Sequence, residues 1–244
     1  MARTAKTTST ARRRTPKAST ATAGTHPRPT VLLLVRHGKT PTTGQVLPGR
    51  APNLHLSEEG LAQAETVAGR IAELAVRPDG SDGPGAAPTA VYASPLERTA
   101  ETARPIARAL GLRVRTERGL LECDFGEWTG RKLADLAKLP EWTTVQRNPS
   151  GFRFPGGESF LEMQTRMTQT LAALAARHPG ETVVAVSHAD PIKAVLAQAA
   201  GTPLDLFQRL TVAPCSVSAL AYTAGGPFVL TVNSTASLNA LAFA

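Results

Sequence analysis

The stretch VLLLVRHG, residues 31–38, decides the fold of this chain and the position of its candidate site. Its first five residues are all apolar, which predicts a strand buried on both faces, as in the parallel sheets of α/β proteins. The stretch ends at Arg36, His37 and Gly38. Because ligands bind beyond the carboxyl ends of the strands in open α/β sheets, we expect this Arg-His pair to lie where chemistry takes place.

A second stretch, TVVAVSH at residues 182–188, repeats the pattern of an apolar strand that ends in a histidine. If both strands belong to one parallel sheet, His37 and His188 face each other across one pocket. Strand and helix patterns alternate along the chain, and residues 216–222 and 228–232 have the pattern of a β-hairpin. The predicted fold class is therefore α/β, a three-layer α/β/α sandwich whose mostly parallel sheet carries an antiparallel edge hairpin.

Sequence patterns also place the helices and the longest loop. A helix is expected to follow Ser57, and another, capped by Ser94 with proline at its first position, is expected to stop at Gly111. A long helix is expected over about residues 158–176. Residues 140–157 show no such pattern and predict an irregular loop of the kind that forms lids or binds substrate.

The basic character of the chain belongs to its first residues. The formal net charge is +8, but seven of the 27 Lys and Arg residues lie in residues 1–29, which contain no acid, so the remainder has 20 cations against 19 acids. We predict a disordered basic tail over residues 1–29 and one domain over residues 30–244. The tail has the composition of a nucleic-acid-binding arm, a targeting peptide or a solvated extension, and we favour the last.

Cysteine usage and hydropathy indicate a cytoplasmic protein. Cys123 and Cys215 form neither a CxxC motif nor a zinc-binding spacing, which favours a reducing compartment. No apolar run approaches the roughly 20 residues that cross a bilayer, so we expect a soluble protein without membrane contact.

Five residues, most of them at predicted strand ends, form a set suited to phosphoryl transfer: Arg36, His37, Arg98, Glu122 and His188. Guanidinium groups bind phosphate oxygens through charge-assisted hydrogen bonds, and histidine can act as a covalent nucleophile. A carboxylic acid can protonate a departing alkoxide and later deprotonate water. Because two arginines and a histidine can neutralise the phosphoryl oxygens, we expect no metal and no cofactor.

The motifs around these residues resemble those of the histidine phosphatase (phosphoglycerate mutase-like) superfamily. They are LVRHGKT at 34–40, ASPLERTAETA at 93–103, LECDFGEWTG at 121–130, PGGES at 155–159 and VSH at 186–188. Five segments in the expected order, over about residues 30–240, make the resemblance specific, whereas Arg-His-Gly alone would not be.

The resemblance implies a role for each of the five residues. His37 is expected to be the nucleophile that becomes phosphohistidine. Arg36, Arg98 and His188 are expected to complete the phosphate pocket, and Glu122 is expected to donate a proton to the leaving group.

Other residues near the site have less direct assignments. Asp124 and Glu127 are close to Glu122 in sequence and are alternatives for the acid. Thr43 stands six positions after the nucleophile, where many relatives carry a phosphate-binding asparagine, and its hydroxyl can donate one hydrogen bond. Arg50 is a candidate to bind a substrate anion from its loop, and the alternative is a solvated loop cation.

The leading prediction is a phosphomonoesterase that hydrolyses a small-molecule phosphate ester through phosphohistidine. A phosphoglycerate-type mutase is the alternative among enzymes, but the long substrate loops of cofactor-dependent mutases have no obvious counterpart here. A non-catalytic phospholigand-binding module is the alternative outside enzymes, and the presence of all five residues argues against it. Nucleic acid is expected as a partner only through the basic tail. The sequence is compatible with a homodimer.

Overall fold

The computed structural model describes Met1 and residues 28–75 and 87–236. Within these residues, six strands form one sheet in the order β3-β2-β4-β1-β5-β6. The strands are β1 (Thr30–Arg36), β2 (Pro88–Ala93), β3 (Val114–Thr116), β4 (Thr182–Ser187), β5 (Val217–Thr223) and β6 (Gly226–Ser234). β1, β2, β3 and β4 are parallel, whereas β5 and β6 pair in antiparallel fashion at one edge. The predicted α/β class and the edge hairpin are confirmed.

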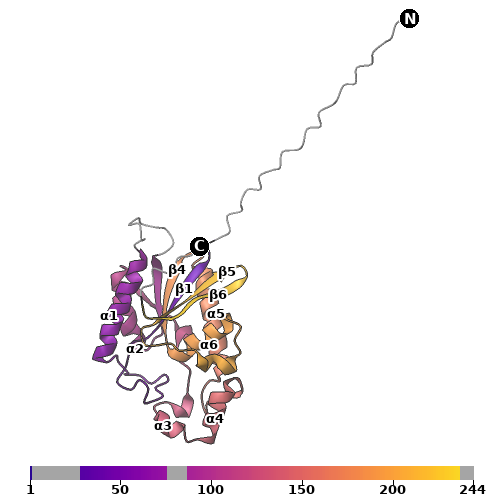
Figure 1. Cartoon of the computed structure of the whole chain (residues 1–244). Coiled ribbons are helices and arrows are strands. Elements are labelled where there is room, and N and C mark those ends of the chain that lie inside the picture. The colour runs from indigo at the N-terminus through magenta and orange to yellow at the C-terminus, as the bar shows by residue number, and fades with distance from the viewer. Residues whose placement is uncertain (2–27, 76–86, 237–244) are drawn as a thin grey trace.

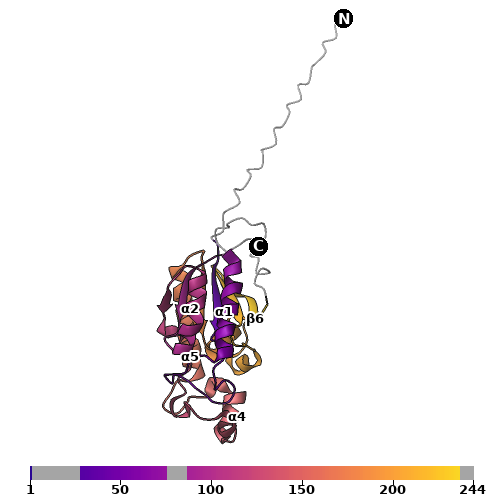
Figure 2. The ribbon, with the colours of Figure 1, turned by 90° about the vertical axis from the view of Figure 1, so that its left-hand side faces the viewer.

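Helices cover both faces of this sheet. The α-helices in the described residues are α1 (Glu58–Ala72), α2 (Glu97–Ala109), α3 (Leu133–Leu136), α4 (Pro140–Arg147), α5 (Phe160–Arg177) and α6 (Ala189–Ala199). The helices α1 and α2 lie on one side of the sheet and α5 and α6 on the other (Figure 1). Turning the molecule by 90° brings α1 and α2 in front of the strands (Figure 2). The molecule therefore has the three predicted layers.

Alternating side chains of β1 build the two halves of the core. Leu33 packs with residues of α1 and α2, such as Ile71 and Ile106, whereas Leu34 packs with residues of α5 and α6, such as Leu171. Successive side chains of a strand point to opposite faces, so a strand covered on both faces needs apolar residues at every position. The unbroken apolar run of the sequence has this physical cause.

A third, largely aromatic cluster lies beyond the carboxyl ends of the parallel strands and includes residues of α3 and α4. It includes Phe125, Trp128, Phe152, Phe154 and Phe160, and Trp128 stacks on Trp142 with ring centroids 6.1 Å apart. The prediction of an irregular loop over 140–157 is wrong in part, because this segment contains α4 and the short 3₁₀ helix η4 (Pro149–Gly151). Proline at the first position of α4 is a helix-start signal.

The other helix predictions differ from the structure mainly at their ends. The predicted cap of α2 is wrong, because α2 begins at Glu97, after Leu96, and has no side-chain cap. Ser94 precedes the helix, and its hydroxyl contacts His188 instead. The long helix α5 begins two residues later than predicted and is capped by Ser159.

Two glycines allow the loop after β1 to cross the start of α1. A Cβ atom on Gly38 would lie 2.6 Å from the carbonyl oxygen of Gly60, and one on Gly60 would lie 2.0 Å from that of Lys39. Both distances are far below van der Waals contact, and the obstacle is backbone in each case. Glycine at both positions is therefore required for this crossing.

The predicted basic tail over residues 1–29 lies almost entirely outside the described residues, so it stays a prediction, as does the boundary at residue 30. Among the residues that the structure does describe, no helix is both long and apolar enough to cross a bilayer.

Candidate active site

The two predicted histidines meet at one edge of the sheet. β1 and β4 are parallel neighbours in which Arg36 is paired with Ser187, so the residue that follows each strand lies at the same level. The ring centroids of His37 and His188 are 5.2 Å apart, with an edge-on angle of 62° between the rings. Both rings are buried. The prediction that His37 and His188 lie close together is confirmed.

The tautomer of His37 follows from a single hydrogen bond. Its Nδ1 lies 2.7 Å from the carbonyl oxygen of Gly38. A carbonyl can only accept, so Nδ1 carries the hydrogen and Nε2 keeps its lone pair. Burial, and then the charges of Arg98 and Arg36, hold the pKa of His37 well below its ordinary value. The imidazole is therefore neutral and its Nε2 is available as a nucleophile at physiological pH.

Two guanidinium groups adjoin this ring, that of the fully buried Arg98 and that of the half-buried Arg36. Arg98, on α2, is fully buried and donates from Nη2 to the Gly49 carbonyl at 2.8 Å, but its Nε and Nη1 have no hydrogen-bond partner. Arg36 donates from Nη1 to the Val212 carbonyl at 2.7 Å, and its Nε is likewise unpartnered. Burial lowers the pKa of both guanidinium groups.

Unpartnered buried donors are costly and rare in folded proteins. Nδ1 of His188 is a further buried nitrogen without a partner. Arg36, Arg98 and His188 thus hold unused polar atoms beside the free nitrogen of His37. This arrangement suits a bound anion with several oxygens, because each oxygen can accept from a donor that the protein leaves unused.

Glu122 supplies a carboxyl group beside these cations. It is buried, and its Oε1 accepts a hydrogen bond from the backbone N–H of Cys123 at 2.9 Å. Burial, and then the neighbouring charge of Asp190, raise the pKa of Glu122 to about 7, although Arg98 and Arg36 act in the opposite direction. A carboxyl group with such a pKa exchanges its proton near neutral pH, as a general acid and base must.

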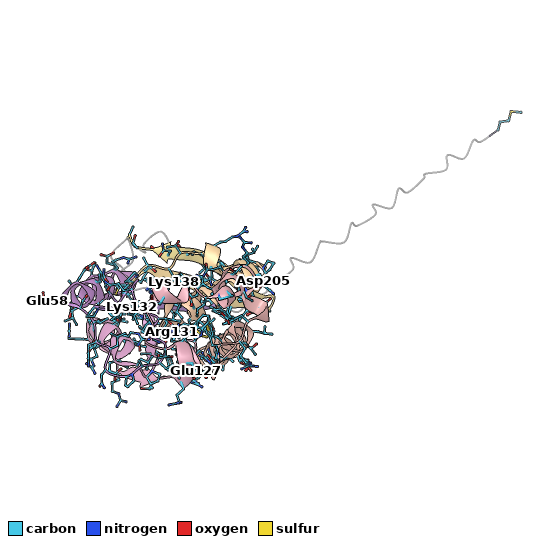
Figure 3. The ribbon with its side chains drawn as sticks, turned by 90° about the horizontal axis from the view of Figure 1, so that it is seen from below. Glu58, Glu127, Arg131, Lys132, Lys138 and Asp205 are labelled. Atoms are coloured by element: carbon cyan, nitrogen blue, oxygen red, sulfur yellow. The ribbon has the colours of Figure 1, made fainter. Side chains whose placement is uncertain are left out.

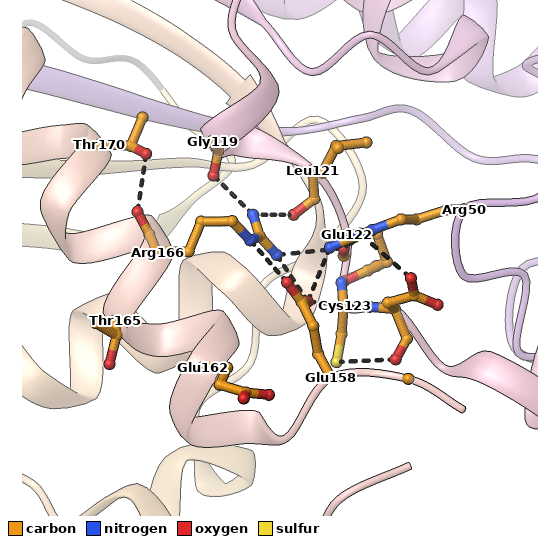
Figure 4. Close-up of polar contacts among 12 residues, drawn as sticks. Arg50, Gly119, Leu121, Glu122, Cys123, Glu158, Glu162, Thr165, Arg166 and Thr170 are labelled. Carbon is orange, nitrogen blue, oxygen red and sulfur yellow. Dashed lines mark hydrogen bonds and ion pairs between the residues drawn. The ribbon is translucent and has the colours of Figure 1, made fainter. Parts of the chain in front are cut away.

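The backbone of Glu122 is held by a network of charged side chains (Figure 4). Its carbonyl oxygen accepts from Arg50 Nε at 2.8 Å and from Arg166 Nη2 at 3.3 Å. Glu158 binds Arg166 through two hydrogen bonds of 3.0 Å and pairs with Arg50 at 2.8 Å. Burial opposes the ionisation of Glu158, but these contacts prevail and its pKa is lowered.

Sequence reasoning missed Arg166 and Glu158 as supporting residues of the site. The PGGES motif that contains Glu158 was a signal, but nothing in the sequence showed that its carboxylate meets Arg166 and Arg50. The structure places Arg50 in this network, where it also pairs with Asp124 at 3.3 Å. A direct contact of Arg50 with substrate stays a prediction.

Thr43 closes the turn that follows β1. Its hydroxyl accepts from the backbone N–H of Thr40 at 2.9 Å and lies 2.9 Å from the Thr40 hydroxyl. A contact of Thr43 with phosphate therefore stays a prediction too. The structure brings together Arg36, His37, Arg98, Glu122 and His188. Arg50 contacts the backbone of Glu122, whereas the side chain of Thr43 contacts Thr40.

The end of the molecule that carries α3 presents charged side chains to solvent. Arg131, Lys132 and Lys138 are exposed there together with Glu127, as the view from below shows (Figure 3). Over residues 28–75 and 87–236, no group of three or more His, Cys, Asp or Glu side chains is arranged to hold a metal ion.

Comparison with known proteins identifies the class to which this fold and site belong. The chain matches the model of the histidine phosphatase superfamily (branch 1) over residues 32–235 and belongs to that family. The resemblance that the motifs indicated is confirmed.

Particular relatives include a phosphatase and a probable mutase. Phosphoserine phosphatase 1 of Hydrogenobacter thermophilus is 32% identical over 181 residues, which are 72% of this chain and 79% of that protein. A probable phosphoglycerate mutase, GpmB of Proteus mirabilis, is 31% identical over 193 residues, 78% of this chain and 83% of the relative. The chain spans 57% of the length of mycobacterial relatives that are 35% identical to it over 217 residues, one of them named a bifunctional protein of Mycobacterium tuberculosis.

Among known structures, a mycobacterial glucosyl-3-phosphoglycerate phosphatase superposes with a TM-score of 0.73 and 25% identity. The match covers 85% of this chain and 100% of that one.

Proposed function

We propose that this protein is a phosphomonoesterase that hydrolyses a small-molecule phosphate ester through a phosphohistidine at His37, without a metal ion. The observation that carries the proposal is the set of buried, unpartnered nitrogens of Arg36, Arg98 and His188 beside a neutral imidazole whose Nε2 is free. Such a site offers hydrogen-bond donors to phosphate oxygens and a nucleophile to the phosphorus atom.

In the first step, Nε2 of His37 attacks phosphorus and the bond from phosphorus to the ester oxygen breaks. The departing alkoxide takes the proton of the Glu122 carboxyl group and leaves as an alcohol. Arg36, Arg98 and His188 stabilise the charge on the phosphoryl oxygens as it moves between the leaving group and the imidazole.

In the second step, water attacks the phosphorus of phosphohistidine. The Glu122 carboxylate accepts a proton from that water, and the P–N bond breaks to release inorganic phosphate and neutral His37. The same carboxyl group thus serves as acid and then as base, for which a pKa of about 7 is well matched.

The chain is similar to two proteins that are named as phosphatases, and this similarity supports hydrolysis over mutase activity. The match to a probable phosphoglycerate mutase keeps phosphoryl transfer to a second hydroxyl as the alternative. We also place the protein in the cytoplasm, because Cys123 and Cys215 are both unpaired and buried.

The test is rapid mixing of the full chain with radiolabelled phosphomonoesters, from a panel of sugar phosphates, phosphoserine and phosphoglycerates, followed by an alkaline quench. Label should appear on the protein in a form that is stable to alkali and lost in acid, as phosphohistidine is. The His37→Ala variant should carry no label and release no phosphate, whereas His55→Ala should behave as wild type, since His55 is exposed and pairs with Glu101.

Turnover by His37→Ala would refute the assignment of the nucleophile. Isomerised substrate without free phosphate would identify a mutase. Tight substrate binding by wild type without label or turnover would identify a phospholigand-binding module.

A further inference from the structure

Ser94 contacts the second histidine from the end of β2. Its hydroxyl lies 2.9 Å from His188 Nε2, and both residues are almost fully buried. The backbone of Ser94 is fixed, because its N–H donates to Val186 at 3.0 Å and its carbonyl accepts from the Thr99 hydroxyl at 2.8 Å. The side-chain hydroxyl is thus held against one nitrogen of the His188 ring.

The direction of this hydrogen bond decides which nitrogen of His188 carries the hydrogen. Burial, and then the charges of Arg98 and other neighbours, hold the pKa of His188 well below its ordinary value, so the ring is neutral. A neutral imidazole has one N–H, and its second nitrogen is an acceptor. If Nε2 donated its hydrogen to Ser94, Nδ1 would be an acceptor. It could then offer no hydrogen bond to an anion bound beside the unpartnered nitrogens of Arg36 and Arg98.

Two observations favour the opposite direction. In the part of the chain that the structure describes, His188 Nε2 is the one acceptor within hydrogen-bond distance of the Ser94 hydroxyl. If Nε2 were the donor, the hydroxyl hydrogen would be buried without an acceptor, which is unfavourable. In addition, Nδ1 of His188 is buried and unpartnered, and it can donate to a bound ligand only in the tautomer that carries the hydrogen on Nδ1.

We infer that Ser94 is a positioning residue, whose hydroxyl donates to His188 Nε2 and thereby fixes the tautomer in which Nδ1–H is offered to the phosphoryl group. This inference rests on the proposed function, because it assigns a cause to the donor that His188 supplies. Ser94 does not touch the phosphoryl group; it acts through His188. The ends of three strands therefore position the site, because Ser94 follows β2, His37 follows β1 and His188 follows β4.

The tautomer is measured directly by long-range proton–nitrogen NMR correlation on the full chain labelled with nitrogen-15 histidine, with His188 assigned from the spectrum of His188→Gln. The wild-type protein should show a protonated Nδ1 and an unprotonated Nε2. Ser94→Ala should shift His188 toward the Nε2–H form, and Ser94→Thr, which keeps the hydroxyl, should retain the wild-type pattern.

Activity and anion binding supply the second measurement. Ser94→Ala should lower kcat for the best substrate by about tenfold to a hundredfold, the loss typical of residues that orient a functional histidine. It should weaken binding of orthovanadate to a similar extent, and Ser94→Thr should recover both. Ser218→Ala is the matched control, because Ser218 is equally buried in β5 and its hydroxyl accepts from Asn233 N–H, away from the histidines.

Two results would overturn the inference. One is a wild-type spectrum with the hydrogen on Nε2 of His188, and the other is a loss in Ser94→Ala no larger than that in Ser218→Ala. Absence of turnover and of label on wild-type His37 would instead refute the proposed function, and the tautomer measurement would still stand.

Discussion

Replacing Glu122 by Gln should stabilise the protein at neutral pH even though it removes the proposed acid. The carboxyl group is buried beside Asp190, and its pKa is raised from 4.5 to about 7. An ionised Glu122 is therefore unfavourable in the folded protein. Gln has a similar shape, its amide carries no charge at any pH, and its oxygen can still accept the Cys123 N–H that binds Oε1.

The magnitude follows from proton linkage. Below pH 4.5 Glu122 is protonated in both the folded and the unfolded chain, so the full stability is present. As pH rises from 4.5 to 7 the unfolded chain loses its proton first, and the free energy of unfolding falls. Above pH 7 the loss is complete and amounts to about 3 kcal/mol, from a pKa difference between 4.5 and about 7 at 1.36 kcal/mol for each unit.

The assay is urea unfolding of wild type and Glu122→Gln at about pH 5 and about pH 8, where most of this difference develops. The stability of the variant relative to wild type should increase by about 2–3 kcal/mol from the lower to the higher pH, because contributions of other groups cancel. Glu97→Gln is the control: hydrogen bonds from its own backbone N–H and from Asn53 N–H lower the pKa of Glu97. Its relative stability should therefore change only below pH 4.5. If the difference in free energy of unfolding between wild type and Glu122→Gln were the same at both pH values, the pKa of Glu122 would not be raised.

Three further outcomes test the supporting structure. Glu158→Gln should lower kcat, measured by steady-state kinetics, by about tenfold to a hundredfold, because it removes the ion pairs that hold the backbone of Glu122. Glu162→Gln should have little effect, because the carboxylate of Glu162 pairs with Arg153 on the surface. Inorganic phosphate at a hundred times its Kd should raise the free energy of unfolding of wild type by about 2.7 kcal/mol and therefore raise its Tm. A thermal-unfolding scan of Arg98→Leu should show no such rise in Tm. Gly60→Ala should cost about 2 kcal/mol or more in urea unfolding, because its Cβ meets backbone, whereas Gly69→Ala on the same helix has open space and should gain about 0.5–1 kcal/mol. Equal effects in either pair of variants would contradict the corresponding account.

The parts of this protein that could be predicted are those set by local pattern. An apolar run such as residues 31–35 can be buried on both faces only at the centre of a layered sheet, and β1 lies there. The polar residues that end β1 and β4 then share one edge of the sheet, which is why the sequence alone predicts that His37 and His188 lie close together.

The parts that could not be predicted depend on contacts between distant segments. Arg50, Glu158 and Arg166 are each unremarkable charged residues in sequence, and their pairing needs the loop after β1 to meet the start of α5. Ser94 has every local feature of a helix cap, but tertiary structure assigns its hydroxyl to His188. Helix α4 is a different failure, because its initial proline is a local signal that the irregular-loop prediction did not use.

The charges of the site also explain why an acid with a pKa near 7 suits it. Burial and Asp190 raise the pKa of Glu122, whereas the positive charges of Arg98 and Arg36 lower it. A bound phosphate ester adds negative charge within reach of the same carboxyl group, and a like charge nearby disfavours ionisation. Substrate binding should therefore increase the protonated fraction of Glu122, which is the form that the proposed first step requires. In the proposed second step, the ionised carboxylate faces the same arginines, and their positive charge stabilises it as the base.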